Sequence, residues 1–110
     1  MTGPAREDLA RLHAALAQCE MALVRRDAVA AALLAQAARH AEGLPGGEWV
    51  AGAARIVRAA GVGGEQPGAR AARKVAQALC RAALQTTEAA LIGAAPGRLP
   101  RPGPPAGGSR

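Results

Sequence analysis

Glycine and proline are absent from residues 5–42, and this uninterrupted stretch constrains the fold of the chain most strongly. These two residues weaken a helix more than any others, whereas alanine, which is frequent here, favours it most. Elsewhere they gather mainly at 43–47, 61–68 and 96–110. The spacing of these breaks predicts three helices, over about 4–42, 48–60 and 69–92, with Thr2 and Pro4 suited to the start of the first.

The first predicted helix carries a single apolar stripe along its length. At about 100° per residue, the residues on this stripe are Leu9, Leu12, Leu16, Cys19, Leu23, Ala30, Leu34, Ala37 and Ala41. From Leu9 to Leu23 the spacing is that of a heptad seam. Beyond Leu23 the stripe consists mostly of alanine, which favours close packing of one helix on another.

Four breakers, Gly43, Pro45, Gly46 and Gly47, turn the chain within a few residues. The helix that follows is therefore predicted to lie antiparallel to the first. Its largest side chain, Trp49, is expected to pack against the first helix. We predict an all-α fold, an elongated antiparallel three-helix bundle in which the first helix, about 58 Å long, is the spine.

The third predicted helix has the widest apolar arc. Such an arc can touch two neighbouring helices, or one neighbour and a partner, and a simple three-helix core explains it equally well. If it binds a partner, the expected contacts are Val75, Leu79, Leu84 and Leu91. The surface would then receive a helix of another protein.

Residues 96–110 contain five Pro and four Gly. This composition cannot bury a core and predicts a disordered tail. One helical domain, residues 1–95, would then precede the tail.

The net charge of +6 suggests a polyanion as a possible partner. Half of the excess lies in the tail, where Arg98, Arg101 and Arg110 have no acidic neighbour. An alternative function is therefore that of a small basic nucleic-acid-associated protein. The residues expected to contact phosphates are Arg55, Arg58, Arg70, Arg73 and Lys74.

No residue pattern in the chain reaches the specificity of a catalytic or metal-binding motif. Cys19 and Cys80 lie far apart without a CxxC spacing, and His13 and His40 have no metal-ligand partner. We expect free thiols, no metal and no cofactor. The sequence thus predicts a protein that is not an enzyme.

The first twelve residues include four charged side chains and no apolar run, so no secretion signal is predicted. The longest apolar run, 28–35, is far shorter than the roughly 20 residues needed to cross a bilayer. We therefore expect a cytoplasmic protein without membrane insertion.

Two stretches resemble a known family. In residues 9–44, apolar stripes are followed by Glu20-x-Ala22-Leu23, then Asp27, then an Ala/Leu run ending near Leu44. In residues 82–99, a helix runs into Gly97-Arg98-Leu99. Together they resemble flagellar export chaperones of the FlgN/FliT kind.

The resemblance implies a cytoplasmic, non-enzymatic helical protein of a type III-type export system. Such a chaperone holds an amphipathic helix of a filament-cap or hook-junction subunit before export. A homodimeric structural bundle is a further alternative, in which a second copy takes the place of the client. Salt dependence separates these functions from nucleic-acid binding, because phosphate contacts weaken steeply with salt.

Overall fold

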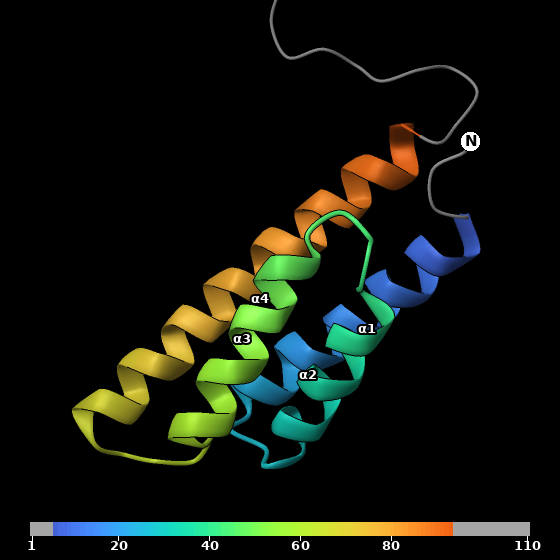
Figure 1. The fold of residues 1–110 in the computed structure, drawn as a ribbon. Coiled ribbons are helices and arrows are strands. Elements are labelled where there is room, and N and C mark those ends of the chain that lie inside the picture. Colours follow the sequence, from blue (N-terminus) through green and yellow to red (C-terminus); the bar gives the residue numbers. More distant parts are fainter. Residues whose placement is uncertain (1–5, 94–110) are drawn as a thin grey trace, which may run out of the picture.

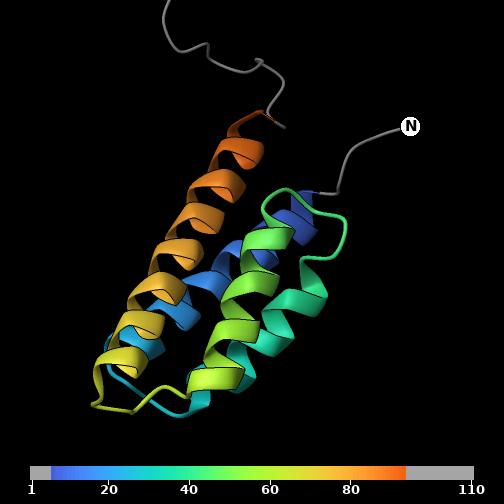
Figure 2. The same ribbon diagram turned by 60° about the vertical axis from the view of Figure 1, so that its left-hand side comes forward.

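The computed structural model describes residues 6–93, which form four helices and no strand: α1 (Arg6–Val24), α2 (Val29–His40), α3 (Gly47–Ala60) and α4 (Pro67–Gly93). Successive helices are antiparallel, and α1 begins at the end of the bundle where α4 finishes (Figure 1). Each helix packs on its two neighbours in a ring, while the diagonal pairs lie farther apart. In Figure 2, α3 accordingly stands in front of α1. The all-α prediction is confirmed, but the bundle has four helices.

The prediction of one helix over 4–42 is wrong, because the helix is interrupted between Val24 and Val29. Arg26 adopts a left-handed conformation with φ of 57°. Its amide donates to the oxygen of Leu23 (3.1 Å), and the amide of Asp27 donates to that of Ala22 (2.9 Å). These two hydrogen bonds form a Schellman motif, which ends a helix and satisfies its last carbonyls.

Ala28, directly before α2, already has helical backbone angles (φ −60°, ψ −23°), so Asp27 takes the role of the N-cap residue. Its Oδ1 accepts a hydrogen bond from the amide of Val29 at 3.1 Å, as an N-cap residue does. The spine of about 58 Å is therefore replaced by two antiparallel helices: α1, with 19 residues, is about 28 Å long, and α2, with 12, about 18 Å. The longest element is α4, with 27 residues, about 40 Å.

The core is built mainly from leucine, valine and alanine. All nine residues of the predicted stripe are buried, although they are divided between α1 and α2. They meet Val50, Ala53 and Val57 of α3, and Ala76, Cys80 and Ala83 of α4. Because so many of these side chains are methyl groups, the four helices can pack closely.

The turn between α2 and α3 brings α3 against α4. Gly46 has φ of 82°, and a Cβ added there would lie 3.4 Å from the Cα of Ala83. A Cβ on Gly47 would lie 2.4 Å from the oxygen of Ala41, so this position requires glycine. Trp49 is 38% exposed and does not belong to the buried row of α3, and its contact with the first predicted helix stays a prediction.

The loop between α3 and α4 is held by a buried guanidinium. Nη1 of Arg73 donates to the main-chain oxygens of Val62 (2.9 Å) and Gly64 (3.2 Å). Val62 is itself buried and closes this end of the core. The predictions for 1–5 and for the tail at 96–110 lie outside the described residues.

Candidate functional site

The four residues predicted to bind a partner do not form one exposed surface on α4. The residues that face the core are Arg73, Ala76, Cys80, Ala83 and Thr87. Val75 is 48% exposed, and Leu79 is half-buried beside α3, where a Cβ added to Gly52 would lie 3.5 Å from its Cδ1. Their contact with a partner stays a prediction.

Leu84 and Leu91 lie on the opposite flank of α4, toward α1. Both are half-buried, and Nη1 of Arg6 in α1 donates to the oxygen of Leu91 at 3.0 Å. Ion pairs follow the same border: Arg81 Nε lies 3.1 Å from Glu20 Oε2. The wide apolar arc of α4 thus covers two neighbouring helices, α1 and α3.

A further ion pair links α1 and α4 near the chain ends of the bundle. His13 Nε2 and Glu88 Oε2 are 3.1 Å apart, with both side chains partly exposed. An exposed His–carboxylate pair of this kind contributes little to stability. No third group that could complete a catalytic triad is hydrogen-bonded to it among the described residues.

The two thiols are free and fully buried. The Sγ of Cys80 donates to the main-chain oxygen of Leu16 at 3.4 Å. Burial raises the pKa of Cys19 to about 11 and that of Cys80 to about 12. Since the thiolate is the nucleophilic form, neither cysteine is suited to catalysis or to metal binding at neutral pH.

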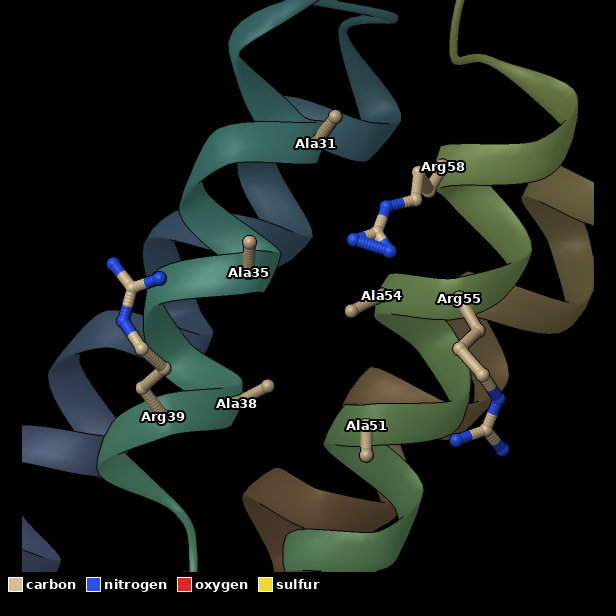
Figure 3. Close-up of a pocket in the computed structure, with 8 residues that line it drawn as sticks. All are labelled: Ala31, Ala35, Ala38, Arg39, Ala51, Ala54, Arg55 and Arg58. Carbon is tan, nitrogen blue, oxygen red and sulfur yellow. The ribbon is translucent and has the colours of Figure 1, made fainter.

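An open groove runs between α2 and α3 (Figure 3). Its walls are methyl groups, from Ala31, Ala35 and Ala38 on α2 and from Ala51 and Ala54 on α3. Its volume is about 300 Å³, at the lower end of the range for small-molecule pockets. Because it is open to solvent, it is better suited to side chains that project from another protein.

Three arginines border this groove: Arg39 on α2, and Arg55 and Arg58 on α3. All three side chains are exposed, and within residues 6–93 none of them takes part in an ion pair. Figure 3 shows the guanidinium of Arg58 reaching across the gap toward α2, whereas the guanidinium groups of Arg39 and Arg55 lie on the outer sides of α2 and α3, directed away from the gap. The groove is therefore apolar inside and positively charged at its rim. We call it the α2–α3 groove.

The structure divides the five residues predicted to contact phosphates. Arg55, Arg58, Arg70 and Lys74 are exposed, whereas Arg73 is only 9% exposed. The guanidinium of Arg73 is hydrogen-bonded to the loop carbonyls of Val62 and Gly64. Arg73 is thus part of the structural support of the α3–α4 loop.

Two further features do not occur in the described part of the chain. No cluster of three or more His, Cys, Asp or Glu side chains that could hold a metal ion occurs in residues 6–93. Over the same residues, no helix is both long enough and apolar enough to span a membrane.

Sequence reasoning did not find the α2–α3 groove. Arg55 and Arg58 were expected only to contact phosphates, and no role was expected for Arg39. The three arginines share a rim because α2 packs beside α3. Because the break at Arg26 was not predicted, residues 29–40 were assigned to the end of one long helix. The helices that pack beside them could therefore not be deduced.

The described residues form an antiparallel four-helix bundle with an open groove that has arginines at its rim. A comparison of the chain with protein-family models, with curated proteins and with solved structures found no match. The similarity to flagellar export chaperones therefore rests on the sequence patterns described above.

Proposed function

We propose that this protein is a non-enzymatic binding module that holds an amphipathic helix of a partner protein in the α2–α3 groove. The observation that supports this most directly is the groove itself, which five alanines on two adjacent helices line, Ala35 exposed and the other four half-buried. Amphipathic helices bind in such grooves through apolar side chains spaced at i, i+3, i+4 and i+7.

The dimensions of the groove suit a helix. The lining runs from Ala31 to Arg39 on α2 and from Ala51 to Arg58 on α3, so the groove is about 12 Å long, enough for contacts at i, i+3, i+4 and i+7 of a bound helix. Helix axes approach to about 8–10 Å, and small residues at the contact favour the short end of this range. Alanine walls therefore allow a third helix to lie close to both.

Export chaperones of the flagellar kind hold a client helix in this general manner, as the sequence resemblance implies. Under this proposal the protein is cytoplasmic and keeps a subunit of the filament or hook from assembling before export. The client surface differs from the one predicted on α4, because Leu79 and Leu84 are partly occupied by α3 and α1.

Nucleic-acid binding is the second candidate, because the exposed Arg55, Arg58, Arg70 and Lys74 have no ion-pair partner within residues 6–93. It predicts an affinity for duplex DNA or RNA that falls steeply between 50 and 200 mM salt. A self-associating bundle instead predicts a dimer in sedimentation without any added ligand.

The test of the helix-binding function is a fluorescently labelled amphipathic peptide of about 15 residues, which as a helix is long enough to span the groove. Ala35, which is exposed on the groove wall, is replaced by leucine to fill the groove. Ala32, exposed on α2 but outside the lining, is replaced by leucine as the matched control. We expect Ala35→Leu to weaken binding at least tenfold and Ala32→Leu to leave it unchanged.

Two results would contradict the proposed site. One is equal binding by the parent protein and by Ala35→Leu. The other is binding that survives Ala35→Leu and is lost in Val75→Asp, since Val75 is exposed on α4. The second result would mean that the client helix binds to the surface of α4 that was predicted from the sequence.

A further inference from the structure

We propose that the helix held in the α2–α3 groove is acidic, with carboxylates flanking its apolar face. This inference rests on the proposed function and adds the chemical class of the partner. Its basis is the set of three arginines on the rim, which no carboxylate of the described chain pairs with.

The carboxylates of this chain that form ion pairs do so elsewhere. Asp8 pairs with Arg11, Glu20 with Arg81, Glu65 with Arg26 and Glu88 with His13. The groove lining itself contains only alanine and arginine. The rim therefore has a positive charge that a partner can complement.

The charge changes sign along the same face of the bundle. At the turn between α2 and α3, an adjoining hollow is lined by two carboxylates, Glu42 and Glu48, together with Arg39. Arg58 lies toward the opposite end, across from Ala31 (Figure 3). The groove thus presents carboxylates near one end and guanidinium groups along the rest.

This polarity also predicts the direction of the bound helix. The N-terminus of a helix carries a partial positive charge and its C-terminus a partial negative one. A helix whose N-terminus lies beside Glu42 and Glu48, and whose C-terminal half carries carboxylates beside Arg55 and Arg58, is complementary at both ends. It would run parallel to α3.

Other occupants complement the groove less well. A second copy of this chain carries the same net charge, +6, and is repelled. A nucleic acid would engage the arginines but leave the alanine walls without an apolar contact. An acidic amphipathic helix satisfies both the walls and the rim.

The experiment compares two peptides that differ only in charge. Both have leucines at i, i+3, i+4 and i+7, and one has glutamate at the flanking positions where the other has glutamine. Binding to the full-length parent protein is measured by fluorescence anisotropy. The same measurement is made with the single variants Arg39→Gln, Arg55→Gln and Arg58→Gln. Arg70→Gln, at an exposed arginine on α4 outside the groove, is the control for net charge.

We expect the glutamate peptide to bind at least tenfold more tightly than the glutamine peptide at low salt, and the difference to shrink as salt is raised. Each rim variant should bind the glutamate peptide about two- to fivefold more weakly, which corresponds to the free energy of an exposed ion pair. Its affinity for the glutamine peptide should not change. Arg70→Gln should affect neither.

Equal affinity for both peptides would overturn the acidic-partner inference while leaving the helix-binding function intact. A loss in Arg70→Gln as large as in Arg58→Gln would also overturn it, because the preference would then reflect net charge alone. Binding of neither peptide would contradict the proposed function itself.

Discussion

The thiol of Cys80 on α4 donates a hydrogen bond to the main-chain oxygen of Leu16 on α1, over 3.4 Å, in the interior of the bundle. Both cysteines have no exposed surface. The contact joins the first helix to the last, and it depends on the thiol being protonated.

The cysteines should therefore resist alkylation in the native protein. At pH 8 the fraction of thiolate is very small, because the pKa of Cys19 is raised to about 11 and that of Cys80 to about 12. We expect iodoacetamide to modify neither residue in an hour at pH 8, and both in concentrated urea, as measured by mass spectrometry. Rapid modification of the folded protein would show that the α1–α4 contact opens readily.

The same burial predicts a loss of stability at alkaline pH. The folded-state pKa values, about 11 and 12, lie above the unfolded value of 9.0. The stabilisation from burying neutral thiols is therefore fully present below pH 9 and is lost as the pH rises toward 11 and 12. The free energy of unfolding should fall by at most about 1.4 kcal/mol per pH unit for each thiol.

Urea denaturation between pH 8 and 10.5 measures this dependence. Cys80→Ala should be less stable at pH 8 because it loses packing, but its stability should fall about half as steeply with pH. If the parent protein and Cys80→Ala lose stability in parallel, the alkaline loss comes from other groups.

The apolar stripe could be predicted from the sequence, and the helix break within it could not. Leu23 and Ala30 are seven residues apart, two helical turns, so the stripe continues in phase across the break. The left-handed residue at the end of a helix is usually glycine, and here it is Arg26. The one indication was Asp27, a residue type that favours the N-cap.

The conformation of Arg26 predicts an unusual response to glycine. A φ of 57° strains the backbone of an arginine, whereas glycine adopts it without strain. The neighbouring Arg25 still has a helical hydrogen bond, from its amide to the oxygen of Met21 at 3.0 Å. Arg26→Gly gives up only an exposed ion pair with Glu65. We expect Arg26→Gly to change the free energy of unfolding by no more than about 0.5 kcal/mol, or to raise it.

Arg25→Gly is the matched control and should cost about 1 kcal/mol, the helix penalty of glycine. Chemical denaturation of the two variants side by side measures the difference. Equal destabilisation by both would mean that residues 25 and 26 have the same backbone conformation.

The start of α2 depends on one side chain. Asp27→Ala removes the acceptor for the amide of Val29 and should lower the free energy of unfolding by about 1 kcal/mol. Asp8→Ala, which loses an exposed pair with Arg11 and a negative charge in the first turn of α1, should cost less than Asp27→Ala. Thermal unfolding followed by circular dichroism distinguishes the two, and a larger loss in Asp8→Ala would contradict the cap.

The candidate groove shows why a site formed between helices is harder to predict than a core. A buried stripe leaves its periodicity in one segment, so Leu12 and Leu34 could be assigned correctly without knowing their partners. Arg39 and Arg58 belong to different helices and share a rim only through packing. Such a site requires the order and direction of the helices, and one missed turn at Arg26 changes both.

Arg73 and Thr87 are the buried polar side chains of the described residues, and the guanidinium of Arg73 donates to two carbonyls of the α3–α4 loop. Arg73→Met keeps most of the aliphatic stem but leaves the oxygens of Val62 and Gly64 without that donor. An unsatisfied buried polar group costs about 1–3 kcal/mol, so we expect a loss of about 2–3 kcal/mol.

The adjacent Lys74 is exposed, and Lys74→Met should alter the free energy of unfolding by less than about 0.5 kcal/mol. Urea denaturation measures the stabilities, and limited proteolysis measures access to the loop at 61–66. We expect cleavage in this loop to accelerate in Arg73→Met only. If both variants have the same stability and the same cleavage rate, Arg73 does not hold the loop, and the α3–α4 connection must be stabilised by the burial of Val62 alone.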